Sequence, residues 1–300
     1  MVLFRGEEAL FDIEYLPLRI SLRSMKRAEL PPYLGSTLRG VIGQALYHTD
    51  KAFYDFLYEN GKNSEKKQDI VKPYIIVPPA VAGSRLTVDP GEELNFDFIL
   101  LGEAAAYVHI LARALQKVQS YGLGAKRYPF SLSQIINVGE QRLLWKEGIY
   151  YEKGGEPVKL ENISCPSDVT GAILRLCTPL RIRRDGSLVR TISFQTLIRN
   201  ITNRVTMITE RYGGWVNQDE VKRLQELAAE IVMIKENLRL VSIERFSNRL
   251  QKKMDFSGLL GEVEYAGDLM PFVPWMLAAQ ILHIGRNTTF GMGRIQVYFY

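Results

Sequence analysis

The chain has 300 residues, of which 46% are hydrophobic and 24% charged, a balance typical of a globular protein with room for two domains. The 38 Lys and Arg against 33 Asp and Glu give a net charge of +5, a modest excess that favours an anionic partner without identifying it. Two cysteines do not make a disulfide framework, and no apolar stretch reaches the ~18 residues that span a bilayer. We therefore expect a cytoplasmic protein with no membrane segment.

The first half of the chain alternates strand-like and helix-like segments. An alternating apolar run predicts a strand over 11–22. Ser36 or Thr37 is the expected N-cap of a helix that runs to about Glu59. A strand, an amphipathic helix, a strand and a hairpin turning at Gly154 and Gly155 are expected next, over 94–101, 104–120, 130–138 and 145–158. A polar segment with a proline, 161–167, is the expected domain boundary.

The second half predicts a similar order of elements. A strand over 172–182 leads through a turn at Asp185-Gly186 to a helix that stops at Gly213. A second helix, a short strand, a third helix and a final strand are expected over 220–236, 262–265, 274–282 and 295–299. When weaker segments are counted, each half gives strand, helix, strand, strand, helix, strand, which is the ferredoxin-like order.

Two short motifs recur in the same order in both halves. The segment Leu16-Pro17-Leu18-Arg19-Ile20 is echoed by Thr178-Pro179-Leu180-Arg181-Ile182, and Gly122-Leu123-Gly124 is echoed by Gly291-Met292-Gly293. We therefore predict an α+β protein of two tandem ferredoxin-like (RRM-like) domains, 1–165 and 166–300, with a cleft between them. Glycine tolerates positive φ and lets a backbone approach a ligand closely, and basic residues beside both glycine loops indicate an anionic ligand.

The glycine-rich run from Gly285 to Arg294 is the strongest single motif. Small residues after a helix can present backbone N–H groups to an anion, and Arg286 and Arg294 add positive charge. The alternative is an ordinary helix-to-strand connection with surface arginines. Spacing alone does not separate these two interpretations.

This run resembles the glycine-rich loop of the RAMP superfamily of CRISPR-associated proteins. The segment from Pro31 to Leu46, which contains Leu38-Arg39-Gly40, resembles the opening helix of the branch that processes CRISPR precursor RNA. Arg245-Phe246-Ser247-Asn248-Arg249, followed by Gly258-Leu259-Leu260-Gly261, resembles the basic segment before that branch's last domain. The resemblance covers nearly the whole chain, with its motifs in the expected order.

The resemblance implies an endoribonuclease that binds CRISPR repeat RNA and cuts the precursor without a metal or other cofactor. The substrate's 2′-hydroxyl would be the nucleophile, leaving a 2′,3′-cyclic phosphate and a 5′-hydroxyl. Such a reaction needs a base, an acid and positive charge at the phosphorane. The scattered acidic residues give no paired Asp motif for two metal ions. CRISPR effector subunits are possible further partners, and the chain is expected to be a monomer or a homodimer.

Three histidines are available for proton transfer. His48 lies on the opening helix near Lys51, with Tyr33 and Tyr47 close in sequence, and the family commonly places a catalytic histidine there, supported by a tyrosine and a lysine. His283 ends the last helix beside the glycine-rich loop, where it could be catalytic or a helix cap. His109 is assigned to packing. The choice between His48 and His283 stays open.

The candidate RNA-binding residues are basic or belong to the glycine-rich loop. Arg39 could contact RNA or pair with a buried carboxylate. Arg181 and Arg190 flank one basic turn, and Lys253 continues the later basic segment. The full set of candidates is Arg39, Lys126, Arg127, Arg183, Arg184, Arg245, Arg249, Lys252, Gly285, Arg286, Asn287, Thr288, Gly291, Gly293 and Arg294.

Two alternative functions remain. The chain could be a non-catalytic RNA-binding RAMP subunit of a CRISPR effector complex, although two complete-looking domains favour the nuclease. It could also be a metabolic enzyme with a duplicated ferredoxin-like fold and a phosphorylated substrate, which would show no salt-sensitive affinity for RNA.

Overall fold

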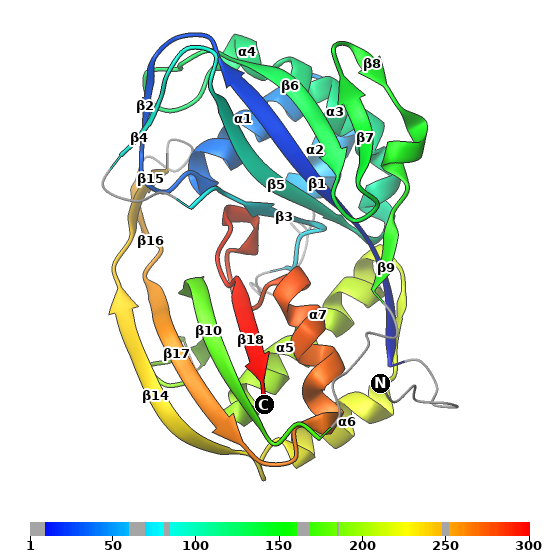
Figure 1. The fold of residues 1–300 in the computed structure, drawn as a ribbon, viewed down its shortest axis with the longest axis vertical. Coiled ribbons are helices and arrows are strands. Elements are labelled where there is room, and N and C mark those ends of the chain that lie inside the picture. The colour runs from blue at the N-terminus through cyan, green and yellow to red at the C-terminus, as the bar shows by residue number, and fades with distance from the viewer. Residues whose placement is uncertain (1–9, 60–69, 81–84, 161–167, 185, 248–251) are drawn as a thin grey trace. The chain divides into compact units, whose positions relative to one another are not determined.

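The computed structural model describes residues 10–59, 70–80, 85–160, 168–184, 186–247 and 252–300 (Figure 1). By its internal contacts the chain divides into two compact units. Unit 1 contains the described residues of Met1–Asp12, Leu160–Thr288 and Met292–Tyr300. Unit 2 contains those of Ile13–Lys159 and Thr289–Gly291, so the tip of the glycine-rich loop is part of unit 2.

Unit 2 is built on an antiparallel sheet whose first strand, β1 (Phe11–Ser24), is central. The strand order is β3-β5-β1-β6-β7-β8, with every neighbouring pair antiparallel. Helix α1 (Gly35–Tyr47) connects β1 to β3, and α3 (Val108–Gln116) connects β5 to β6. This is the ferredoxin-like order, and β7 and β8 extend it. The other strands are β3 (Tyr74–Val77), β5 (Glu93–Leu101), β6 (Phe130–Asn137), β7 (Arg142–Lys146) and β8 (Ile149–Tyr150).

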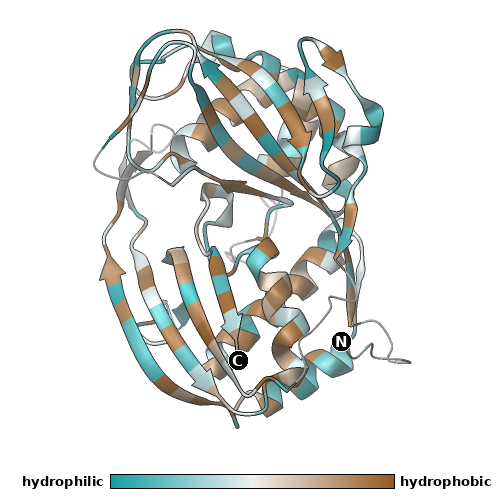
Figure 2. Cartoon of the chain, viewed as in Figure 1, coloured by the Kyte–Doolittle hydropathy of each residue, from teal (hydrophilic) through white to brown (hydrophobic). Residues whose placement is uncertain are grey.

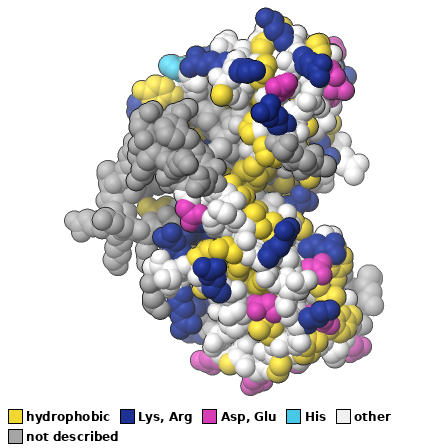
Figure 3. Space-filling view, turned by 90° about the vertical axis from the view of Figure 1, so that its left-hand side faces the viewer, with side chains coloured by type: hydrophobic (Ala, Val, Ile, Leu, Met, Phe, Trp, Pro, Cys, Tyr) yellow, Lys and Arg dark blue, Asp and Glu magenta, His cyan; other side chains and the backbone are white. Residues whose placement is uncertain are grey.

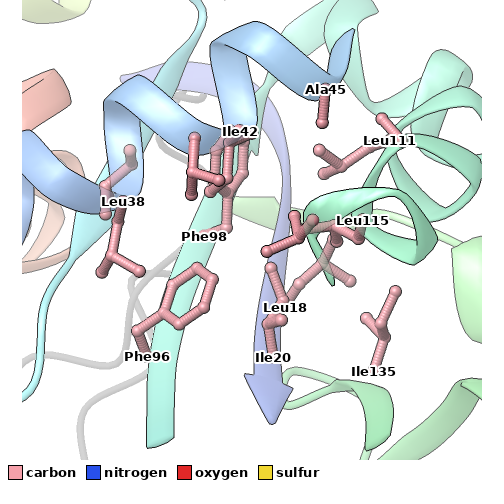
Figure 4. Close-up of a cluster of buried hydrophobic side chains, with 14 of the residues drawn as sticks. Leu18, Ile20, Leu38, Ile42, Ala45, Phe96, Phe98, Leu111, Leu115 and Ile135 are labelled. Carbon is pink, nitrogen blue, oxygen red and sulfur yellow. The ribbon is translucent and has the colours of Figure 1, made fainter. Parts of the chain in front are cut away.

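The core of unit 2 lies between this sheet and helices α1 and α3. Figure 4 shows side chains of α1 and α3 packed over those of β1, β5 and β6. Alternate residues of the strands point toward the helices, which is why the strands appear banded by hydropathy in Figure 2. Removing this apolar surface from water stabilises the unit and fixes the orientation of α1. The labelled side chains are Leu18, Ile20, Leu38, Ile42, Ala45, Phe96, Phe98, Leu111, Leu115 and Ile135.

Unit 1 repeats the topology on a smaller sheet. Its strand order is β14-β17-β10-β18, again antiparallel throughout. Helix α5 (Phe194–Tyr212) connects β10 to β14 by way of α6, and α7 (Val273–Leu282) connects β17 to β18. The four strands are β10 (Gly171–Leu180), β14 (Val232–Val241), β17 (Gly258–Ala266) and β18 (Ile295–Phe299).

The remaining elements are short. The helical ones are α2 (Lys51–Tyr54), α4 (Val118–Tyr121), α6 (Gln218–Leu227), a π-turn (Asp55–Glu59) and the 3₁₀ turns Gly102–Tyr107, Glu152–Gly155, Met270–Phe272 and Thr288–Phe290. The strands are β2 (Ala28–Leu30), β4 (Leu86–Val88), β9 (Val158–Leu160), β11 (Arg183–Arg184), β12 (Ser187–Leu188), β13 (Trp215–Val216), β15 (Glu244–Ser247) and β16 (Lys252–Asp255). No helix among the described residues is long and apolar enough to cross a membrane.

The fold class predicted from the sequence is confirmed: the chain is α+β, with two ferredoxin-like units. The recurring Leu-Pro-Leu-Arg and Thr-Pro-Leu-Arg segments lie on β1 and at the end of β10, which are the equivalent central strands. Both Gly-x-Gly loops connect a helix to the last ferredoxin-like strand of their half of the chain. Gly213 ends α5 with a φ of 87°, as expected of a glycine C-cap.

Several element predictions are wrong. Helix α1 ends at Tyr47 rather than near Glu59, and its N-cap is Leu34, with no side-chain cap from Ser36 or Thr37. The expected hairpin turns between β7 and β8 at Glu147-Gly148, while Gly154 and Gly155 lie in a 3₁₀ turn. The expected helix 220–236 stops at Leu227, because the chain then turns into β14. Pairing with β17 selects the extended conformation there.

Candidate functional site

His48 lies on the surface of unit 2, immediately after the last turn of α1. Its backbone N–H donates to the carbonyl oxygen of Gln44 at 3.3 Å, so it closes the helix. Leu38, Ile42 and Ala45 are buried on α1. His48 comes after the last helical residue, as the C-cap, and its imidazole is exposed to solvent.

Two aromatic rings flank the imidazole of His48. The ring of Tyr121 is stacked on it, with centroids 5.8 Å apart and an interplanar angle of 15°. The ring of Tyr47 meets it edge-on, at 5.3 Å and 89°. Among the described residues the imidazole makes no side-chain hydrogen bond, so these ring contacts are what hold it in place. The arrangement leaves both ring nitrogens available to a substrate.

A lysine supplies positive charge next to this histidine. Lys117 is exposed and donates from Nζ to the backbone carbonyl oxygen of His48 at 3.3 Å. Lys117 is the N-cap of the short helix α4, and Tyr121 is the last residue of α4, just before the loop Gly122-Leu123-Gly124. Sequence reasoning noted this loop but missed these two residues. The position of the loop after an amphipathic helix was the available signal.

The other predicted catalytic residues lie differently. Lys51 pairs with Asp55, with Nζ and Oδ2 2.6 Å apart, and this hydrogen bond raises the pKa of Lys51. Tyr33 precedes the N-terminus of α1, and 13 helical residues, roughly 20 Å of helix, separate it from His48. Its hydroxyl donates to the carbonyl oxygen of Phe290, and burial raises its pKa. The structure thus brings Tyr47 to His48 but not Tyr33.

Arg39 lies inside unit 2 between two aromatic rings. Its guanidinium carbon is 4.7 Å from the ring centroid of Tyr58 and 4.6 Å from that of Phe290. Such cation–π contacts are strongest when the cation is desolvated, as it is here. The ion pair with a carboxylate that the sequence left open is not formed among the described residues. Arg39 therefore helps to fix the tip of the glycine-rich loop against α1.

Backbone hydrogen bonds to the end of β10 and within the loop itself hold the glycine-rich loop in place. The N–H groups of Arg286 and Gly293 donate to the carbonyl oxygens of Arg181 and Pro179, at the end of β10, and that of Met292 donates within the loop. A side chain at Gly293, where φ is 72°, would meet the backbone of Ile284. The glycines therefore serve close packing of the chain, and Arg286 and Arg294 remain the groups that offer charge.

His283 lies beneath this loop in unit 1. It is 2% exposed, and its Nδ1 is 3.2 Å from the carbonyl oxygen of Met292. Burial lowers the pKa of His283 to about 3, and the positive charges of Arg204 and Arg294 act in the same direction. At neutral pH the imidazole is therefore uncharged and donates Nδ1–H to the carbonyl oxygen.

The remaining candidates are distributed over both units. Lys126 and Arg127 are exposed in the turn after α4, where Arg127 has a φ of 51°. Arg181 is buried, donating to the carbonyl oxygen of Ser257 and lying 3.4 Å from Oδ2 of Asp255. Arg183 and Arg184 are exposed in the hairpin β11–β12. In the glycine-rich loop Arg294 is exposed, Gly285, Arg286 and Asn287 are partly buried, and Thr288, Gly291 and Gly293 are buried.

Part of the predicted basic segment cannot be placed. Arg249 lies outside the described residues, and Arg245 and Lys252 are described only by their backbone, which pairs β15 with β16. His109 is exposed on α3, so its assignment to packing is wrong. Figure 3 shows Lys and Arg side chains spread over the face it presents, with acidic and apolar side chains between them. The described residues of this face do not form a single continuous basic patch.

Two sequence-family models match the chain. One, described as an N-terminal domain, matches residues 13–162, and the other, described as the CRISPR-associated endoribonuclease Cas6, matches residues 174–295. A search of curated proteins found no match.

Several solved structures share the fold. Cas6 (TTHB231) from Thermus thermophilus is similar over 98% of this chain and 100% of that one, at 14% identity and a TM-score of 0.58. The TTHB231 product complex gives 15% identity and 0.60, over 95% and 99% of the two chains. The Cas6 (TTHA0078) product complex gives 16% and 0.53, over 96% and 99%. Residues 174–295 thus match the family model of the CRISPR-associated endoribonuclease Cas6, and the chain as a whole shares the fold of the solved Cas6 structures.

Proposed function

We propose that this protein binds CRISPR repeat RNA and cleaves precursor CRISPR RNA by attack of the substrate's own 2′-hydroxyl, without a metal ion. The match of residues 174–295 to the Cas6 endoribonuclease family model supports this activity. The observation that carries the mechanism is the exposed imidazole of His48, flanked by two aromatic rings and next to a lysine. The products would be a 2′,3′-cyclic phosphate and a 5′-hydroxyl.

His48 is the proton-transfer group of this proposal. An imidazole can accept the proton of the 2′-hydroxyl or donate one to the leaving 5′-oxygen near neutral pH, provided that it reaches the RNA. His48 is exposed, so RNA can approach it. His283 is 2% exposed and kept neutral by burial, which argues for a structural role.

Lys117 is the proposed source of positive charge at the phosphorane. Its ammonium group lies within hydrogen-bond distance of the backbone of His48, so a phosphate that reaches the imidazole would also meet the lysine. Tyr121 is a positioning residue, because its ring lies parallel to the imidazole and limits rotation of that side chain. Lys51 is less suited to this role, since its ammonium group is paired with Asp55.

RNA binding is assigned to basic groups in each of the two units. Lys126 and Arg127 follow α4 directly, and Arg286 and Arg294 belong to the glycine-rich loop. Several phosphate contacts would make the affinity fall steeply with salt. One similar solved structure is a Cas6-RT-Cas1–Cas2 complex, of whose chain this one covers 46%, and association with other CRISPR proteins is part of the proposal.

The test is cleavage of a labelled RNA that carries the CRISPR repeat of the organism encoding this chain, in the presence of EDTA. The wild type should cut once per repeat and leave a 2′,3′-cyclic phosphate. His48→Ala should slow single-turnover cleavage by roughly 10²–10⁴-fold and leave RNA affinity nearly unchanged. His109→Ala removes another exposed histidine of unit 2 and is the matched control, with wild-type turnover expected.

Three results would contradict the proposal. Cleavage only after addition of a divalent ion would refute the metal-independent mechanism. Full activity of His48→Ala would remove His48 from the chemistry. Tight binding without cleavage by the wild type would favour a non-catalytic RAMP subunit instead.

A further inference from the structure

A buried arginine lies on the apolar face of α5 in unit 1. Leu197, Ile201, Val205 and Ile208 form this face at helical spacing, and Arg204 shares it with only 5% of its surface exposed. Among the described residues no carboxylate pairs with Arg204. Burying an unpaired charge is costly, and a hydrophobic residue of similar volume would avoid the cost. We therefore attribute the presence of an arginine at this position to the hydrogen bonds that its N–H groups make.

The guanidinium of Arg204 bridges the two ends of one segment. Nε donates to the carbonyl oxygen of Leu282, the last residue of α7, at 2.6 Å, and Nη2 donates to Oγ1 of Thr288 at 3.2 Å. The helix C-terminus carries partial negative charge, which offsets part of the buried positive charge. Both contacts hold residues 283–288 against α5. This segment contains the end of the helix connection and the first residues of the glycine-rich loop.

A second buried side chain acts on the same loop. His283 lies between the two residues that Arg204 holds, and its Nδ1 contacts the carbonyl oxygen of Met292 on the far side of the loop. His283 and Asn287 both adopt positive φ, of 52° and 66°, so this stretch departs from the preferred backbone of its residues. Such a conformation persists only when its surroundings enforce it. Arg204 contributes two of the enforcing hydrogen bonds.

We propose that Arg204 is a positioning residue for RNA binding: it holds the glycine-rich loop in the conformation that presents Arg286 and Arg294 to the RNA backbone. The inference rests on the proposed function, since it assigns this loop to RNA. Arg204 itself is buried and does not touch the substrate. It therefore acts on the affinity for RNA and leaves the proton transfer at His48 unaffected.

The experiment compares Arg204→Met, which keeps most of the volume and removes the N–H groups, with Thr288→Val, which removes one acceptor. The Kd for the labelled repeat RNA and the single-turnover cleavage rate at saturating RNA are measured below the melting temperature of each variant. Arg204→Met should raise Kd about tenfold and leave the saturated rate within about twofold, since a hydrogen bond to a charged group is lost. Thr288→Val should raise Kd by a smaller factor.

Two further variants separate positioning from general stability. Thr202→Val removes a buried hydroxyl two residues away on α5, which accepts from Gln225 rather than contacting the loop. It should lower the melting temperature and leave Kd unchanged. Arg204→Lys keeps the charge but cannot bridge both acceptors, so its Kd should lie between those of the wild type and Arg204→Met. The double variant Arg204→Met/Thr288→Val should bind no more weakly than Arg204→Met.

Each outcome decides between the two proposals. A wild type that binds the RNA, with Arg204→Met binding equally well, overturns the inference alone. Equal weakening in Thr202→Val and Arg204→Met also overturns it, because the effect would then be general destabilisation. A wild type that does not bind the RNA overturns the proposed function and the inference with it. Should Arg204→Met fail to fold, wild-type Kd in both Arg204→Lys and Thr288→Val is the refuting result.

Discussion

Replacing Tyr121 by leucine tests whether ring stacking orients the imidazole of His48. The two rings lie 5.8 Å apart at 15°, and the described residues offer the imidazole no side-chain hydrogen bond. An aromatic pair of this kind is worth about 0.5–1.5 kcal/mol. Each 1.36 kcal/mol corresponds to a tenfold change in rate, so the loss of this constraint should slow cleavage by about 2- to 12-fold.

The assay is single-turnover cleavage of the repeat RNA at saturating protein, with Kd measured in parallel. Leucine keeps an apolar side chain at this half-buried position, so folding should be retained, and Kd should change little. Tyr121→Phe keeps the ring and removes only the hydroxyl, and should cleave at close to the wild-type rate. A wild-type rate for Tyr121→Leu would refute the stacking argument. A loss in Tyr121→Phe equal to that in Tyr121→Leu would transfer the role to the hydroxyl.

Two other predictions concern charge. Lys117→Met should slow cleavage at saturating RNA by about tenfold, less than the 10²–10³ of a buried oxyanion donor, because this lysine is exposed to solvent; an unchanged rate would assign the charge to another residue. The second concerns acid stability, because His283 has a pKa of about 3 when folded and an ordinary value when unfolded. The unfolded state then binds the extra proton, so this residue makes the free energy of unfolding fall with decreasing pH between about 6.5 and 3, at up to about 1.4 kcal/mol per pH unit. His283→Asn, which tolerates positive φ, should show a shallower pH dependence in urea unfolding, and identical slopes would contradict the assignment.

The ferredoxin-like order of both units could be predicted because its strongest elements have clear patterns. Strand β1, helix α5 and strand β18 show the expected alternation, amphipathicity and glycine C-cap. The edge strands β3 and β14 could not be predicted from the sequence. Residues 232–236 lie at the end of a segment rich in helix-forming residues, and they become a strand only because β17 supplies backbone partners.

The candidate site was predictable only in part for a similar reason. A histidine at the end of α1 is visible in the sequence, but its neighbours Lys117 and Tyr121 come from a segment some 70 residues later. Arg204 falls on the apolar stripe of α5 by its spacing, but the sequence does not show that its guanidinium meets Leu282 and Thr288, some 80 residues later. Tertiary contacts, rather than local spacing, decide which side chains meet.

The tip of the glycine-rich loop has a consequence for dissecting the chain. Residues 289–291 are far from the rest of unit 2 in sequence, yet Phe290 supplies one of the two rings that enclose Arg39 and accepts the hydroxyl proton of Tyr33. A fragment that ends at residue 159 would lack Phe290. The guanidinium of Arg39 would then lose one of its two ring contacts, and the hydroxyl of Tyr33 would lose its acceptor. Supplying the loop tip in trans, as a short peptide, is the direct way to complete such a fragment.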